Sequence, residues 1–157
     1  MCDYSLMAIP NRLAVSGEHL VVHRFEAGTV GLASASDLRR QECRKAQNHG
    51  FWARLTDCFD PQDIQPIPAV CIPPGARLLV QDISPKLQHE CGLQEMEAAV
   101  FTQLTAVVNT FRDAVRFHNG VEIRLQRLDE GQRVCVLDLS SADEPTTAIT
   151  GQQTMMV

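Results

Sequence analysis

Residues 112–139 read RDAVRFHNGVEIRLQRLDEGQRVCVLDL, and this stretch decides the fold of the chain. Apolar and polar side chains alternate over residues 121–126, which is the pattern of a strand with one buried face. A second apolar run, residues 134–139, follows the turn-forming residues 129–131. The stretch therefore predicts a meander of three consecutive antiparallel strands.

The first turn of this meander fixes the register of its first two strands. A two-residue turn would place apolar side chains opposite charged ones. A three-residue loop, residues 118–120, pairs Phe117 with Val121 instead. It also pairs Val115 with Ile123, so that the apolar side chains share one face of the sheet. We therefore predict the three-residue loop, with its glycine in the left-handed conformation.

The second turn has the same chemistry, with a glycine at the end of residues 129–131. The resulting register pairs Leu125 with Cys135 and Ile123 with Leu137. It places Cys135 on the core face, which removes this thiol from the candidate site residues.

Composition limits the class of protein. The chain has 157 residues, enough for one domain with a core of useful size. Its net charge of -5 argues against general nucleic-acid binding. No apolar run is long enough to cross a bilayer, and the first residues do not form a secretory signal. We therefore expect a cytoplasmic protein that binds neither nucleic acid nor membrane.

The chain has six cysteines, and none of them is part of a CxxC pair. Without a secretory signal, a reducing compartment fits better than a set of disulfides, and most of the thiols are expected to be small buried residues.

The rest of the chain adds strands to the meander. Strands are predicted at residues 13–15, 19–25, 29–33, 69–72, 76–83 and 96–108, and a short helix between Ser84 and Gly92. We expect one mainly-β domain over residues 1–139, a small antiparallel barrel or two-layer sandwich of about seven to nine strands. Residues 140–157 lack a periodic core pattern, which predicts a disordered C-terminal tail.

Residues 36–60 differ from the strands and predict a helical insert that covers one side of the sheet. Ser36 is the expected N-cap. The segment is polar at first and then carries an apolar stripe at helical spacing, made of Phe51, Trp52, Leu55 and Phe59. The stripe packs either on the sheet or on a partner protein, and Arg40 and Arg44 lie on a basic face beside it. We expect this insert to take part in a protein–protein surface or in homo-oligomer contacts.

Cys2 is the candidate nucleophile. Removal of Met1 would leave its thiol beside a free amine, a pair that acts as nucleophile and base in N-terminal nucleophile hydrolases. No oxyanion motif accompanies it, so whether the protein is an enzyme stays open.

A metal site is the second chemical hypothesis. Cysteine and histidine suit zinc, iron or copper, and the candidate ligands are Cys2, Cys71, His89, Cys91 and His118. Only His89 and Cys91 are close in sequence, and their spacing of two residues diverges on a helix. Each candidate ligand is also explained by an ordinary structural role, so no cofactor is predicted outright.

The opening MCDYSL, the AVCIPPG segment and the final DAVRFHNG…LQRLDEGQRVCVLDL resemble a family of small uncharacterised bacterial proteins that begin Met-Cys-Asp-Tyr-Ser-Leu. The resemblance covers about half of the chain and leaves out residues 36–65. It implies a cysteine at the positions of Cys2 and Cys71, which ranks these two thiols first. It implies no activity.

Two functions follow from these observations. The first is a small bacterial binding or accessory protein that acts through a protein–protein surface. The alternative is a metal- or thiol-dependent enzyme, or a metal-binding protein, centred on Cys2 and Cys71.

Overall fold

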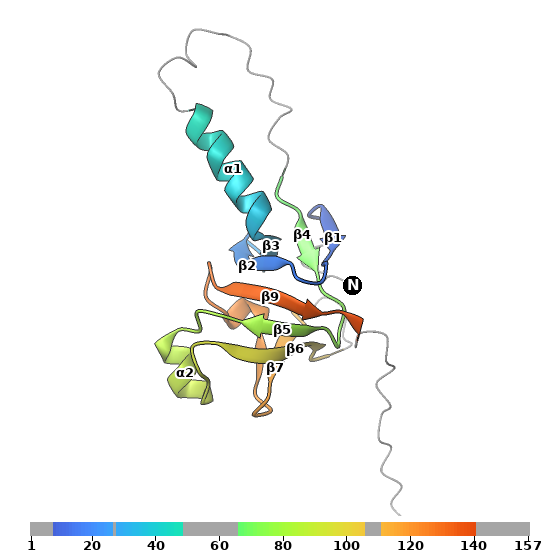
Figure 1. Cartoon of the computed structure of the whole chain (residues 1–157), viewed down its shortest axis with the longest axis vertical. Helices are drawn as coiled ribbons and strands as arrows, with labels where there is room; N and C mark the ends of the chain where they lie inside the picture. Colours follow the sequence, from blue (N-terminus) through green and yellow to red (C-terminus); the bar gives the residue numbers. More distant parts are fainter. Residues whose placement is uncertain (1–7, 27, 49–65, 106–110, 141–157) are drawn as a thin grey trace, which may run out of the picture.

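The computed structural model describes residues 8–26, 28–48, 66–105 and 111–140, and these form one mixed sheet of nine strands with two α-helices (Figure 1). Across the sheet the strand order is β1-β4-β3-β2-β9-β5-β6-β7-β8, so β1 and β8 are the two edges. The strands are β1 (Asn11–Leu13), β2 (His19–Arg24), β3 (Val30–Ser34), β4 (Ala69–Cys71), β5 (Arg77–Val80), β6 (Glu97–Gln103), β7 (Asp113–Phe117), β8 (Glu122–Arg124) and β9 (Arg133–Asp138). The predicted mainly-β fold is confirmed.

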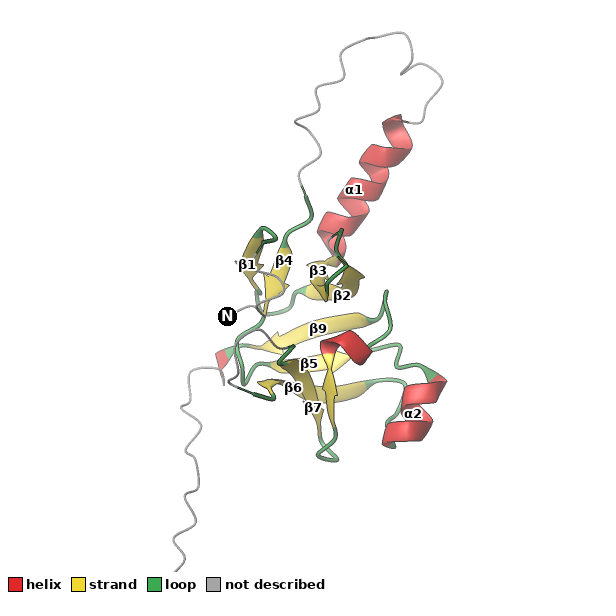
Figure 2. Ribbon diagram, turned by 180° about the vertical axis from the view of Figure 1, so that it is seen from behind, coloured by secondary structure: helices red, strands yellow, loops and turns green. Residues whose placement is uncertain are grey.

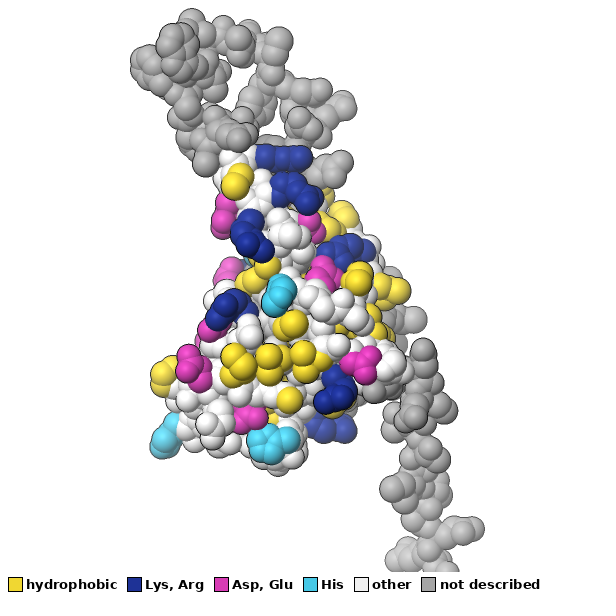
Figure 3. All heavy atoms as spheres, viewed as in Figure 1, with side chains coloured by type: hydrophobic (Ala, Val, Ile, Leu, Met, Phe, Trp, Pro, Cys, Tyr) yellow, Lys and Arg dark blue, Asp and Glu magenta, His cyan; other side chains and the backbone are white. Residues whose placement is uncertain are grey.

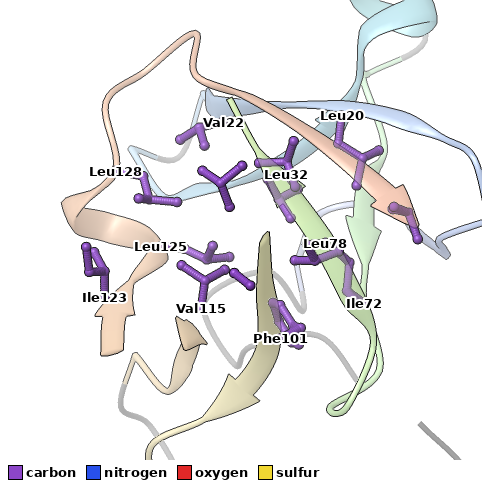
Figure 4. Packing of buried hydrophobic residues seen from close by; sticks show 14 of the residues in the cluster. Leu20, Val22, Leu32, Ile72, Leu78, Phe101, Val115, Ile123, Leu125 and Leu128 are labelled. Atoms are coloured by element: carbon purple, nitrogen blue, oxygen red, sulfur yellow. The ribbon is translucent and has the colours of Figure 1, made fainter. Parts of the chain in front are cut away.

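The sheet curls around one main hydrophobic core. Inward side chains from eight of the strands join one cluster, and Figure 4 shows Leu20, Leu78 and Val115 converging on the same interior. Alternation along each strand sends every second residue into this core, as the completely buried Leu78 and Val136 illustrate. Figure 2 shows the curved sheet from behind; its edge strands β1 and β8 do not pair with each other, so the sheet is not closed.

The first hairpin of the predicted meander is confirmed with its register. Val115 pairs with Ile123, and the Phe117 amide donates to the Val121 carbonyl at 2.9 Å. Gly120 closes the loop at a φ of 82°, a conformation that glycine adopts without steric cost. The strand predicted within residues 96–108 is confirmed over Glu97–Gln103 as β6, residues 106–108 lying outside the described ranges, and the short helix is confirmed as α2 (Pro85–Cys91), closed by Gly92.

The third strand of the meander is not where the sequence predicted it. β9 pairs with β2 and β5, not with β8, so the pairings of Leu125 with Cys135 and of Ile123 with Leu137 are wrong. Residues Leu125–Arg127 form a 3₁₀ helix, η4, that ends β8 after Arg124. Leu125 and Leu128 are both buried, because side chains three residues apart lie on one side of a 3₁₀ helix.

The face assigned to Cys135 is wrong for the same reason. Val134 and Val136 fill the core, while Cys135 is half-buried and Leu137 is exposed on the other face. The run Val-Cys-Val-Leu is apolar on both faces, which is typical of a strand whose two faces are both covered. Its alternation therefore contains no signal that distinguishes the inner face from the outer face.

The helical insert begins as α1 (Ala35–Asn48), directly after β3 and one residue before the predicted N-cap Ser36. Its first turns pack on β2 and β3 through Leu38, and the rest projects away from the sheet (Figures 1 and 2). The prediction that the insert covers one side of the sheet is therefore wrong for α1. The stripe of Phe51, Trp52, Leu55 and Phe59 and the predicted tail after Ser140 lie outside the described residues.

Within the described ranges, neither α1 nor α2 is both long and apolar enough to span a membrane.

Candidate functional site

The outer side of four neighbouring strands carries a continuous set of apolar side chains. We call it the outer apolar face and define it by Val21 on β2, Cys135 and Leu137 on β9, Leu79 on β5, and Ala98 and Val100 on β6. These residues alternate with core residues such as Leu78 and Val136, so they must point away from the core. Strand order places β2, β9, β5 and β6 side by side, which makes the face continuous.

One row of paired residues runs straight across this face. Cys135 pairs with His19 on one side and with Leu79 on the other, and Leu79 pairs in turn with Ala98. On one flank of this row, Leu137 is 44 % exposed and Val100 is 39 % exposed. Figure 3 shows apolar atoms gathered over this part of the surface. Contiguous exposed apolar side chains of this kind mark contact surfaces more often than isolated ones do.

Each end of the face carries an arginine and an aspartate. At one end the Arg133 guanidinium donates to both carboxylate oxygens of Asp82, with one of the two bonds at 2.8 Å. These hydrogen bonds lower the pKa of Asp82 below its usual value. At the other end Arg77 pairs with Asp138 across β5 and β9. Hydrogen bonds from Ser140, and then the charge of Arg77, lower the pKa of Asp138.

α1 bounds the face on the β3 side. Leu32 points into the core, so its neighbour Ala33 points outward, and Leu38 of α1 packs with Ala33 and Phe25 there. The helix therefore leaves the sheet on the outer side. Arg40 is exposed on this helix and pairs with Asp37 at 3.4 Å, and Arg44 is also exposed.

A polar cluster fixes the start of α1 to the sheet. Arg12 of β1 donates to both carboxylate oxygens of Glu18, and it lies 3.7 Å from Asp37 of α1. The Val15 amide donates to Glu18 at 3.0 Å. The bonds from Arg12, and next that from Val15, lower the pKa of Glu18 against the effect of burial, and Glu18 raises the pKa of Arg12. All of these polar groups are matched within the cluster, so it reads as a structural clamp.

The predicted metal ligands are only partly brought together. His89 and Cys91 lie on α2, and the β7–β8 turn approaches that helix, where the Asn119 side chain donates to the Cys91 carbonyl at 2.9 Å. His118 in this turn instead lies 3.1 Å from a carboxylate oxygen of Glu97. Among the described residues, no group of three His, Cys, Asp or Glu side chains could hold a metal ion.

Cys71 is disulfide-bonded, whereas Cys43, Cys91 and Cys135 are free. A disulfide sulfur is neither a thiolate ligand nor a nucleophile, so the metal and thiol hypotheses need Cys71 in its reduced form. Cys2, the candidate nucleophile, lies outside the described residues.

Sequence reasoning missed the outer apolar face. Sequence motifs point to chemically reactive side chains, whereas most residues of this face are aliphatic. The available signal was the run Val134 to Leu137, apolar at four consecutive positions, together with Leu78-Leu79 and Ala99-Val100 on strands that otherwise alternate. Each of these strands has one or two more apolar residues than a half-buried strand requires.

Neither a protein-family model, nor a curated protein, nor a solved structure matches this chain. The resemblance to the bacterial family that begins Met-Cys-Asp-Tyr-Ser-Leu therefore stays a prediction, and the function is argued from geometry.

Proposed function

We propose that this protein is a small binding or accessory module whose docking surface is the outer apolar face. The observation that supports this proposal is the row of outward-facing apolar side chains over β2, β9, β5 and β6, of which Leu137 and Val100 are more than a third exposed. A patch with an apolar centre and charged ends has the anatomy of a protein–protein interface. α1 begins at the border of this face beside β2 and β3 and projects away from the sheet, so Arg40 belongs to the proposed rim.

The rigidity of the face supports a docking role. Its residues lie on strands that are hydrogen-bonded on both sides, and the layer beneath them is the buried core. Side chains held in this way lose little freedom when a partner binds, which reduces the entropic cost of association. Leu79 and Leu137 are the largest side chains of the face, so their burial is expected to contribute most to binding.

We place this module in the cytoplasm as part of the same proposal. The free thiols of Cys43, Cys91 and Cys135 support a reducing compartment. A reducing compartment would open the disulfide at Cys71, so this proposal implies that Cys71 is reduced in the cell.

Photo-crosslinking in living cells tests the docking surface. A benzophenone amino acid at position 79 is expected to form a covalent adduct with another polypeptide. A second exposed apolar site, Phe111 just before β7, is the control position, because it is 47 % exposed and lies outside the four strands of the face. Adding Leu137→Asp should abolish the adduct at position 79. Equal crosslinking from positions 79 and 111, or an adduct that survives Leu137→Asp, would remove the docking function.

A further inference from the structure

We infer that the partner on the outer apolar face is a second copy of this chain, an inference that rests on the docking function proposed for that face. The reason lies in the two ends of the face. Arg133 and Asp82 close one end, and Arg77 and Asp138 close the other. Because each end carries one positive and one negative side chain, this surface can be complementary to the same surface on a second copy.

A two-fold axis that lies in the face and runs across the strands shows how the match forms. The paired row His19, Cys135, Leu79 and Ala98 marks the natural position of this axis. Rotation about it exchanges the two ends of each strand. Arg133 of one copy then lies close to Asp138 of the other, because these residues lie on opposite sides of Cys135 in β9, two and three residues from it.

The same rotation also exchanges the two ends of β5. Arg77 at its start lies opposite Asp82, which follows its end, in the other copy. Near the axis, Leu79 and Cys135 of one copy meet the same residues of the other. Apolar side chains therefore face apolar side chains, and each arginine faces an aspartate, without any further partner.

The net charge of the chain favours this partner over a basic one. The chain carries a formal charge of -5, whereas the two arginines and two aspartates of the face sum to zero. A surface evolved for a basic partner would concentrate the acidic side chains there. A locally neutral face is instead the part of an acidic protein where two copies approach with the least repulsion.

Charge reversal with complementation tests this pairing by sedimentation equilibrium of the full chain. The wild-type protein is expected to approach twice the monomer mass with rising concentration. Arg133→Asp alone places two carboxylates opposite each other, and Asp138→Arg alone places two guanidinium groups opposite each other. Each variant is expected to dimerise at least about tenfold more weakly.

In an equimolar mixture the two variants can form a heterodimer. In it, the acidic side chain introduced at position 133 faces the basic side chain introduced at position 138, and the second pair is Arg133 with Asp138 as in the wild type. The mixture is expected to dimerise within about threefold of the wild-type affinity, a recovery that loss of folding cannot produce. Leu137→Asp should also give a monomer, while Phe111→Asp, at an apolar position of similar exposure outside the face (47 % against 44 %), should leave the dimer intact. A wild-type protein that stays monomeric throughout, or a mixture that shows no recovery, overturns the inference.

The outcomes separate this inference from the proposed function. An adduct from position 79 with a different protein, combined with a monomeric chain in the ultracentrifuge, overturns the second copy as partner and keeps the docking function. A monomeric chain with no adduct from position 79 overturns both.

Discussion

Glu18 joins three elements that are separate in sequence, because it accepts from Arg12 of β1 and from the Val15 amide while Asp37 of α1 lies against the same arginine. Its side chain is only 13 % exposed. Glu18→Gln is expected to lower the free energy of unfolding by about 1–2 kcal/mol, between the values for exposed pairs and for buried charged hydrogen bonds. Urea unfolding at neutral pH measures this loss.

The pH dependence of the Glu18 variant has a definite sign. The folded-state pKa of Glu18 is lowered, so its stabilisation is present above the unfolded-state value, about 4.3, and is lost as the pH falls through the folded pKa. The stability gap between wild type and Glu18→Gln should therefore close under acid conditions. Glu130→Gln is the control, since Glu130 is mostly exposed and its loss should cost less than about 0.5 kcal/mol. A gap that stays constant below the usual glutamate pKa contradicts the clamp.

Cys71 gives a second prediction at this scale. Because it is disulfide-bonded, a reducing agent should lower the free energy of unfolding by about 2–4 kcal/mol. Cys71→Ser should be less stable from the outset and insensitive to the reducing agent, and Cys135→Ser should respond as wild type does, since Cys135 is free. Identical unfolding midpoints of wild type with and without reductant would contradict the bond.

The candidate site could not be predicted from single residues. Cys71, His118 and Cys91 attract attention because their side chains are reactive, yet no described group of them converges on a metal position. Leu79 and Leu137 attract none, because aliphatic residues usually belong to a core. Only their position on the outer side of particular strands distinguishes them, and position depends on the fold.

At the scale of one element, β5 gives a direct test of which side chains face the core and which face away from it. Leu78 is completely buried, and its neighbour Leu79 lies on the outer apolar face. Leu78→Ala should lower the free energy of unfolding by about 2–5 kcal/mol, because it leaves a cavity in the core. Leu79→Ala should cost less than about 1.5 kcal/mol, because no cavity forms.

Chemical denaturation of the two variants, which remove the same side chain at adjacent positions, provides the comparison. Equal losses of stability, or a larger loss for Leu79→Ala, would contradict the assigned faces of β5. The Leu79 variant should also weaken dimerisation, whereas the Leu78 variant reports on folding alone.

Elements that depend on local chemistry were predictable. The β7–β8 hairpin follows from a three-residue loop with a glycine at positive φ, and its pairing of Val115 with Ile123 was predicted correctly. The second turn also has its glycine, Gly131, at positive φ. It still does not make a hairpin, because η4 turns the chain away before β9 begins. Turn residues therefore predict where the chain turns, but they do not predict which strand the next strand pairs with.

At the scale of the whole molecule, the number of strands was predictable and their order was not. Short alternating runs separated by turn residues indicated seven to nine strands, and the described residues contain nine. The insertion of β9 between β2 and β5 joins the N-terminal and C-terminal halves of the chain. Such long-range pairing depends on the total burial of the core, which no local pattern records.

The position of β9 also creates the proposed function. With β9 at the edge of a meander, Cys135 and Leu137 would face the core and no outer apolar face would exist. With β9 in the centre, their side chains join those of Leu79 and Val21 on the outside. Docking and dimerisation therefore both rest on this one strand.

The most direct measurement is a set of nuclear Overhauser contacts from the backbone protons of Cys135 in isotope-labelled protein. The central position of β9 predicts contacts with Leu79 on β5 and with His19 on β2. Contacts with Leu125 in their place, together with contacts between Ile123 and Leu137, would contradict it.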